Sequence, residues 1–431
     1  MSIEEKMTID ERRKYLHKMQ KRYKQASRKE KGQLLDEMEQ VTELHRKYLI
    51  GLLKGDLKRQ QRRRQRGRTY GPKVDDALRV IYESFDYICA ERLTPNLVWM
   101  TKQLARHGEL EPSQELLAKL GQISISTVKR ILRRIRQDEA RLPRRGPRRA
   151  NARWRDIPMK RIAWDTVTPG HFEVDLVHHC GPTTAGEYMC TLQMIDIATG
   201  WSERVAVLGR SYRVMRHAFE RVVQRLPFPI LEIHPDNGSE FLNHHMLRFW
   251  GQIVQGVQIS RSRPFFKNDN RNVEQKNRTL VRAYLGYDRF DSVIQTHATN
   301  QLYEKMWVYY NLFQPVLHLK EKQIVRQNGQ RPRVRRHYDH ARTPFDRLCA
   351  TDVILPQHQA RLTALRDQIN PRVLRQQIYA ALDQLFALPG ATPGTVEDVY
   401  QTLLCGSDSH VAGVQLRDLI FNRTPIVQGT P

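Results

Sequence analysis

The chain has 431 residues and a formal net charge of +26, from 72 basic and 46 acidic side chains. Hydrophobic residues make up 40% of it, which supplies enough apolar material for folded cores and excludes wholesale disorder. This positive excess points to a polyanionic partner, nucleic acid before a membrane surface. No run of ~18 apolar residues predicts a membrane span, and the charged start does not read as a secretory signal. Five irregularly spaced cysteines favour free thiols and a cytoplasmic protein.

Residues 1–70 carry 21 basic and 10 acidic side chains, and their apolar positions recur at helical spacing. Thr8 and Glu11 have the spacing of a capping box at a helix start, and so do Ser27 and Glu30. Two apolar stripes further along predict two short amphipathic helices joined by a tight turn. This pattern suits a first helix-turn-helix unit and suits an ordinary helical hairpin equally well.

A second helical domain is predicted over residues 71–140, and its last part reads SQELLAKLGQISISTVKRILRRIR. Gly121 breaks one short helix, and Ser124 or Ser126 can cap the next. A short helix, a glycine turn and a basic second helix is the arrangement by which a recognition helix enters the DNA major groove. The alternative is a basic face that is merely solvated. We expect DNA contacts from four cations of the second helix: Lys129, Arg130, Arg133 and Arg134.

Residues 141–161 hold nine basic side chains against a single acid, with three prolines and a glycine among them. Such a composition predicts an extended basic linker between folded units. DNA contacts are therefore expected from Arg144, Arg145, Arg148 and Arg149.

The pattern over residues 162–350 changes to alternating strands. HFEVDLVHH places Phe172, Val174 and Leu176 on one face and Glu173, Asp175 and Val177 on the other. The predicted order is three strands, helix, strand, helix, strand and helix, with Asp196 given a structural role in the turn before the third strand. Three antiparallel strands extended by βα units form a mixed sheet flanked by helices, which is the α/β architecture of an RNase H-like domain.

Three carboxylates in this region are candidates for catalysis. Asp175 lies in the middle of a strand, Asp236 follows the fourth strand just before a glycine turn, and Glu274 lies in the first turn of a helix. Together they could hold two Mg²⁺ ions ~3.5–4 Å apart and promote an in-line displacement at phosphorus. Two of these acids also have a plainer explanation: Asp236 as a turn residue and Glu274 as a helix-start charge. For Asp175 the alternative is Glu173, which lies on the same strand face and is the rival for its role.

Five segments now become informative together: HFEVDLV, TLQMIDIATGWSE, HPDNGSEFLN, SRSRPFFKNDNRNVEQKN and YNLFQPVLHLKEK. They resemble the integrase catalytic domain of bacterial insertion-sequence transposases, in the DDE superfamily that includes retroviral integrases. The resemblance covers roughly residues 160–350. It implies that Asp175, Asp236 and Glu274 are the catalytic, metal-binding triad, with two Mg²⁺ or Mn²⁺ ions as cofactor.

The resemblance implies a DNA transposase that binds the terminal inverted repeats of its element, cleaves the 3′ ends and transfers the strands to target DNA. The protein would act as a homo-oligomer on double-stranded DNA, associated with the bacterial nucleoid and without a membrane partner. Two alternatives remain: an RNase H-like metal-dependent DNA nuclease without strand transfer, and a non-catalytic helix-turn-helix repressor. A mostly helical region is expected over residues 351–431. Phosphate contacts are expected near the triad, from Arg261, Arg263, Lys267, Lys276 and Arg278.

Overall fold

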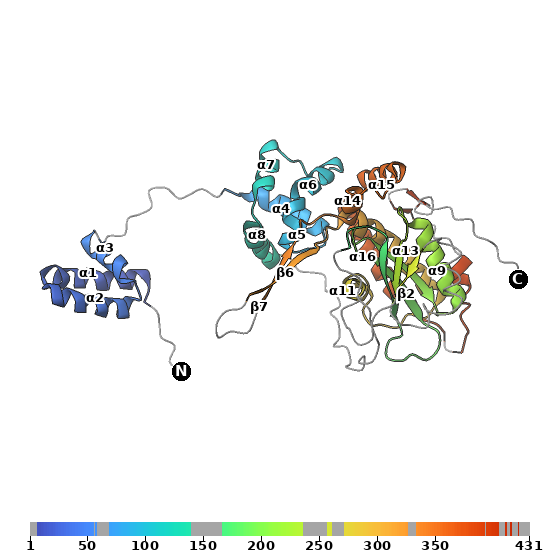
Figure 1. Ribbon diagram of the computed structural model, residues 1–431, viewed down its shortest axis with the longest axis horizontal. Helices are drawn as coiled ribbons and strands as arrows, with labels where there is room; N and C mark the ends of the chain where they lie inside the picture. The colour runs from blue at the N-terminus through green and yellow to red at the C-terminus, as the bar shows by residue number, and fades with distance from the viewer. Residues whose placement is uncertain are drawn as a thin grey trace. The chain divides into compact units, whose positions relative to one another are not determined.

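The computed structural model describes residues 7–55, 57, 69–138, 166–235, 257–260, 271–325, 333–392, 394–404, 410–411, 414–415 and 421. The chain forms two compact units, Met1–Thr69 and Tyr70–Pro431 (Figure 1). Among the described residues, no helix combines the length and the apolar character that crossing a bilayer requires.

The first unit consists of three helices: α1 (Ile9–Gln25), α2 (Arg28–Thr42) and α3 (Arg46–Lys54). Both predicted capping boxes are present. The Thr8 hydroxyl accepts from the Glu11 amide while the Glu11 carboxylate accepts from the Thr8 amide, and Ser27 and Glu30 repeat the arrangement. The α1 helix adds a third element to the two that the apolar stripes predict. The three helices enclose a small core of Leu16, Met19, Leu35, Met38, Leu49, Leu53 and Leu57.

The second unit begins with a helical block. Its elements are α4 (Pro72–Ser84), α5 (Ala90–Leu93), a 3₁₀ turn (Thr94–Asn96), α6 (Leu97–Arg106), α7 (Gln114–Gln122) and α8 (Ile125–Asp138). Of the two serines proposed to cap α8, Ser124 accepts a hydrogen bond from the Thr127 amide at 3.2 Å. The helix buries one apolar face, formed by Val128, Ile131, Leu132 and Ile135.

The centre of the second unit is a five-stranded sheet in the order β3-β2-β1-β4-β5. Its strands are β1 (His171–His178), β2 (Met189–Asp196), β3 (Ser202–Leu208), β4 (Glu232–Pro235) and β5 (Gln258–Ile259). The strands β3, β2 and β1 are antiparallel, whereas β4 and β5 extend the sheet in parallel with β1. The mixed sheet expected in this region is therefore confirmed.

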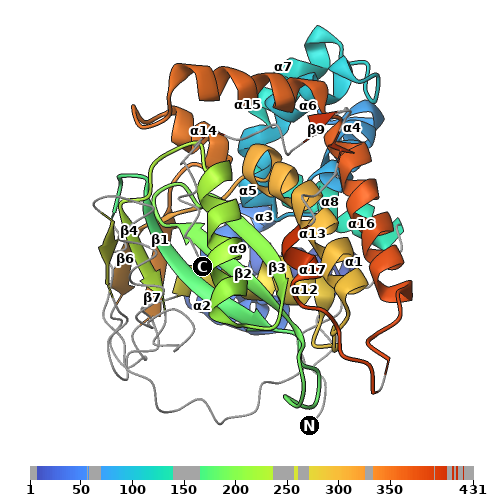
Figure 2. The same cartoon turned by 90° about the vertical axis from the view of Figure 1, so that its right-hand side faces the viewer.

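Helices flank the sheet, as predicted (Figure 2). Helix α9 (Tyr212–Arg225) packs against β3, and α11 (Arg271–Lys276) packs against β1 and β2. The α11 helix continues through a π-helical stretch, Asn277–Arg282, into α12 (Ala283–Leu285). Helix α13 (Val293–Val308) follows and ends in a π-helical turn, Tyr309–Phe313.

The free edge of the sheet, at β3, is closed by side chains. The Asn300 side chain bonds both backbone groups of Ala206, and the Asn311 side chain bonds both backbone groups of Ser202, at 2.8 to 3.0 Å. Two asparagines thus replace the missing neighbouring strand, which protects an edge that could otherwise pair with another chain.

The remaining elements follow the sheet domain. A two-stranded ribbon comprises β6 (Leu319–Val325) and β7 (Arg333–Tyr338). The described residues beyond it include four helices, α14 (Pro344–Cys349), α15 (Pro356–Gln368), α16 (Pro371–Ala387) and α17 (Gln401–Leu404). A short ladder, β8 (His410–Val411) with β9 (Val414–Gln415), lies near the end.

The helical block α4–α8 shares one hydrophobic core with the sheet and the later helices. Hydrogen bonds cross the boundary as well. The Tyr309 hydroxyl donates to the Ser84 carbonyl at 2.7 Å, and the Gln314 amide donates to the Phe85 carbonyl at 2.8 Å. The helices that precede the basic linker in sequence are therefore packed directly onto the domain that follows it.

Asp196 has the structural role expected of it. Its carboxylate accepts from the amides of Gly170 and Thr199, both at 2.8 Å, and from the Thr199 hydroxyl at 2.6 Å. Burial raises the pKa of this carboxyl group. These bonds close the turn between β2 and β3 and leave Asp196 inside the fold.

Candidate active site

Asp175 lies on β1, the central strand of the sheet, and is half-buried. Its Oδ1 accepts a hydrogen bond from the following amide, of Leu176, at 2.8 Å. Its Oδ2 accepts from Nδ2 of Asn277 at 2.5 Å. Asn277 follows directly after α11, so this bond connects the central strand to the helix that carries Glu274.

Glu173, two residues earlier on the same face of β1, makes a second connection to α11. Its carboxylate accepts from the Val273 amide and from Nδ2 of Asn272, both at 2.8 Å, and the residue is 2% exposed. Because the first amides of a helix lack partners within it and carry partial positive charge, a carboxylate at this end stabilises the helix. Glu173, the rival to Asp175, therefore serves as the N-terminal cap of α11.

Glu274 lies in the first turn of α11 and is exposed. Strand β1 is hydrogen-bonded to the chain on both sides of Glu274. Glu173 accepts from Val273, which precedes Glu274, and Asp175 accepts from Asn277, which follows it. The expectation that Glu274 lies in the first turn of a helix is confirmed, since α11 begins at Arg271. Two of the three predicted acids thus belong to one connected assembly of strand and helix.

The third acid, Asp236, lies outside the described residues. Strand β4 ends at Pro235, and Pro235 is paired with Val174, the residue before Asp175. The described residues contain no group of three or more His, Cys, Asp or Glu side chains that could hold a metal ion. The two carboxylates that are described supply oxygen donors, the type that Mg²⁺ prefers, and the donor set therefore fits this metal.

A row of polar side chains crosses the sheet from Asp175. The strand register pairs Asp175 with Gln193 on β2, and Gln193 with Arg204 on β3. Arg204 is 2% exposed, and its guanidinium carbon lies 5.8 and 5.5 Å from the ring centroids of Tyr303 and Tyr310. Burial lowers the pKa of this guanidinium group.

Lys276, one of the expected phosphate contacts, faces this interior row. It is half-buried, and burial together with the nearby cations Arg92 and Arg204 lowers the pKa of its ammonium group to about 7. Arg278, two residues further on, is exposed. Of these two cations, Arg278 is therefore the one that presents its charge to solvent.

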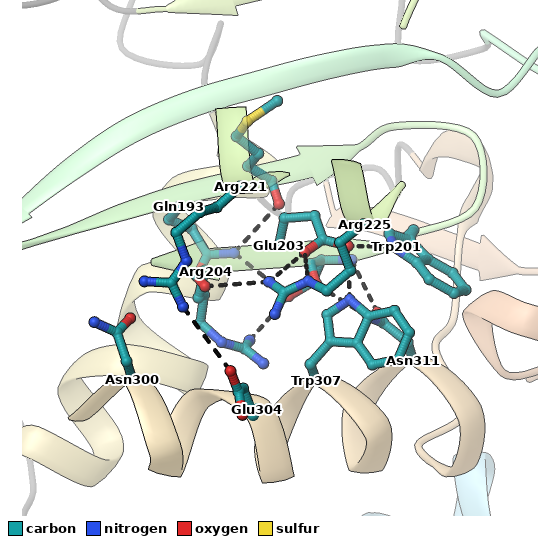
Figure 3. Close-up of polar contacts among 12 residues, drawn as sticks. Gln193, Trp201, Glu203, Arg204, Arg221, Arg225, Asn300, Glu304, Trp307 and Asn311 are labelled. Carbon is teal, nitrogen blue, oxygen red and sulfur yellow. Dashed lines mark hydrogen bonds and ion pairs between the residues drawn. The ribbon is translucent and has the colours of Figure 1, made fainter. Parts of the chain in front are cut away.

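The opposite face of β3 holds a buried carboxylate that sequence reasoning overlooked (Figure 3). Oε1 of Glu203 accepts from the indole nitrogens of Trp201 and Trp307 at 2.9 and 2.6 Å, and Oε2 accepts from Nε and Nη2 of Arg225 at 2.8 and 2.6 Å. The Glu203 side chain is fully buried. The only sequence signal was a pair of adjacent charges, Glu203 and Arg204, within an otherwise apolar strand.

The four cations expected to contact DNA from helix α8 differ in their partners. Lys129 forms an ion pair with Glu91, and Arg134 forms one with Asp75 at 2.5 Å. Arg130 donates to the hydroxyl of Thr127, its own neighbour on the helix, and Arg133 is exposed. Two of the four expected DNA contacts thus already pair with acids of the helical block. The other expected cations, Arg144, Arg145, Arg148, Arg149, Arg261, Arg263 and Lys267, lie outside the described residues.

Solved structures similar to parts of this chain include three retroviral integrases. The catalytic core domain of BIV integrase aligns with 34% of this chain and 85% of its own, at 15% identity and a TM-score of 0.25. The HTLV-2 integrase catalytic core domain in complex with magnesium aligns with 34% and 90%, at 17% identity and a TM-score of 0.24. The simian T-cell lymphotropic virus intasome, in complex with PP2A regulatory subunit B56 gamma, aligns with 50% and 70%, at 12% identity and a TM-score of 0.29.

No protein-family model matches the chain. A curated bacterial protein does: the uncharacterized protein y4rM of Sinorhizobium fredii (strain NBRC 101917 / NGR234) is 37% identical over 302 residues. The alignment covers 70% of this chain and 86% of y4rM. The chain belongs to the same protein family as y4rM of Sinorhizobium fredii.

Proposed function

We propose that this protein is a DDE-type DNA transposase, which cleaves the 3′ ends of its element and joins them to target DNA. The observation that carries the proposal is the connection between Asp175 on the central strand and the helix bearing Glu274. Two residues about a hundred positions away in sequence, Val273 and Asn277, bond to Glu173 and Asp175 on one strand face. The sequence resemblance to integrase catalytic domains assigns catalysis to the same carboxylates.

In this proposal Asp175, Asp236 and Glu274 hold two Mg²⁺ ions. When bound, the ions would neutralise charge on the scissile phosphate and lower the pKa of the attacking water. The neighbouring residues of the chain keep the carboxylates in place. Asn277 fixes the orientation of Asp175 through its amide, and Glu173 fixes the start of the helix from which Glu274 projects.

The reaction consists of two in-line displacements at phosphorus. In the first, water attacks the phosphodiester at the end of the element, the proton passes to solvent, and the element is left with a free 3′-OH. In the second, this 3′-OH attacks a phosphodiester of the target and displaces the target's own 3′ oxygen. One bond to phosphorus forms and one breaks in each step, so no covalent link between protein and DNA is needed.

The basic helix α8 supplies a DNA contact in the same proposal. Arg130 and Arg133 are exposed on it, and Lys129 and Arg134 pair with Glu91 and Asp75. An arginine that faces outward from a short, basic second helix is placed to reach phosphate or a guanine edge. Because two element ends must be cut and joined together, we propose that the protein acts as a homo-oligomer on DNA.

The test uses the full chain, a linear duplex bearing the inverted repeats that flank its gene, a target plasmid and Mg²⁺. We expect joined products from the wild type and from Glu115→Gln, a control that removes an exposed carboxylate of α7. Asp175→Asn should neither cleave nor join, while its affinity for the duplex stays unchanged. Cleavage without joining would identify a nuclease, and binding without either reaction would identify a repressor; both results contradict the proposal.

A further inference from the structure

The β6–β7 ribbon is a two-stranded element separate from the five-stranded sheet. Its antiparallel register runs from Leu319 opposite Tyr338 to Val325 opposite Arg333, with an irregularity between Leu319 and Glu321. Figure 1 shows the ribbon (orange) extending outward from the second unit. A two-stranded hairpin has little stability by itself in water, so a projecting one needs an anchor or a partner.

The anchor lies at the root of the ribbon. Asp339 accepts from the amide of His318 at 2.8 Å and from Nη1 of Arg347 at 2.7 Å. Arg347 is 6% exposed and also donates to the carbonyl of Val316 at 3.0 Å. Both strands are therefore fixed to the folded unit at one end through a buried ion pair.

Beyond this root the ribbon is strongly cationic. Residues 319–338 contain seven lysines and arginines and one acid, Glu321. Of the cations whose side chains are described, Lys320, Arg335 and Arg336 are all exposed. Arg335 and Arg336 are consecutive in a strand, so they project from opposite faces, and each face of the ribbon carries a cation.

We infer that the β6–β7 ribbon is a second DNA-binding element, which lies in a groove of duplex DNA and contacts phosphates with both faces. The major groove of B-DNA admits a two-stranded ribbon, and cations on its two faces can reach the two phosphate backbones that border the groove. The alternative is that these cations only prevent the ribbon edge from pairing with another molecule. In that case the ribbon would make no contact with duplex DNA. The inference rests on the proposed function, because it supplies a further contact for the same DNA.

The experiment measures binding of a fluorescein-labelled duplex of arbitrary sequence over a range of salt concentrations. All variants carry Asp175→Asn, so that the DNA stays intact. Arg335→Ala/Arg336→Ala should bind more weakly and reduce the slope of log affinity against log salt by about two, one for each phosphate that the variant no longer neutralises. Arg335→Lys/Arg336→Lys keeps both charges and should retain the original slope.

The matched control removes two exposed cations elsewhere in the second unit, with Lys102→Ala/Arg210→Ala. An equal reduction of slope in this control would overturn the inference, since general electrostatics would then explain the effect. An unchanged slope in the ribbon variant would also overturn it, and so would failure of the parent protein to bind duplex. If the Asp175→Asn protein binds duplex but the wild type never joins DNA, only the proposed reaction is contradicted. The salt slopes then still test whether the ribbon binds DNA.

Discussion

Asn277 donates its side-chain amide to the carboxylate of Asp175 across 102 positions of sequence. This bond occupies one oxygen of a candidate metal ligand and thereby fixes the direction in which the carboxylate can face. Because Asn277 lies three residues after Glu274, the same bond sets how far the helix stands from the strand. The geometry of the two candidate catalytic acids thus depends on this neutral side chain together with Glu173, which holds the start of the helix.

Replacing Asn277 with alanine should lower the rates of cleavage and joining by roughly ten- to one-hundred-fold, the range typical of residues that orient metal ligands. The Mg²⁺ concentration needed for half-maximal activity should rise, because Asp175 would lose its fixed orientation. Measuring cleavage over a series of Mg²⁺ concentrations tests this expectation. A lower rate with an unchanged Mg²⁺ requirement would count against a role in orienting Asp175.

Glu173 should be needed for the helix rather than for the reacting atoms. Glu173→Ala leaves the amide of Val273 without its acceptor inside the protein, which we expect to destabilise the fold by about 1–3 kcal/mol and to reduce cleavage. Glu173→Gln keeps an acceptor at this position and should retain most of the stability and most of the cleavage activity. Urea unfolding and cleavage assays on the two variants provide the comparison. If Glu173→Gln were as inactive as Asp175→Asn, Glu173 would belong to the catalytic set.

Local features of this chain could be predicted from sequence, because they depend on residues a few positions apart. The capping boxes at Thr8 and Ser27 are examples, and so is the buried face of α8. The strands β1 to β3 were predictable as well, since alternating apolar residues and a turn at Asp196 define them.

The choice between Glu173 and Asp175 could not be made from the residues alone. Both lie on the same face of one strand, so the alternation of apolar and polar residues cannot distinguish the catalytic one from the structural one. What separates them is the position of α11, whose amide at Val273 meets Glu173 from a hundred residues away. Lys276 illustrates the same limit, since only the packed structure places it beside Arg92 and Arg204.

Glu203 and Arg225 offer a prediction about stability. Two nitrogens of Arg225 donate to one buried oxygen of Glu203, and two indole nitrogens donate to the other. Glu203→Gln would leave the cation of Arg225 without its partner, so we expect a loss of about 3 kcal/mol in the free energy of unfolding. Urea denaturation measures this loss. The control is Glu115→Gln, which breaks an exposed pair with Lys119 and should cost less than about 0.5 kcal/mol. Equal losses in the two variants would contradict the role given to burial.

His318, at the root of the ribbon, predicts how stability responds to acid. Burial, then the cations Arg347, Lys276 and Arg342, lower the pKa of its imidazole to about 4, while Asp339 opposes them. The unfolded chain takes up the proton near pH 6.5 and the folded protein only near pH 4, so this residue removes stability as the pH falls through that window. Across the whole window the loss is about 3 kcal/mol.

Replacing His318 with glutamine should therefore make thermal stability less sensitive to pH between 6.5 and 4. The melting temperatures of the variant and the wild type should differ by a constant amount above pH 6.5, and the difference should shift in favour of the variant on acidification. Thermal unfolding followed by circular dichroism at several pH values measures this. His17, which is exposed on α1, provides the control. His17→Gln should show the same dependence of melting temperature on pH as the wild type. If the wild type and His318→Gln gave parallel curves of melting temperature against pH, His318 would be excluded as the source of the acid sensitivity.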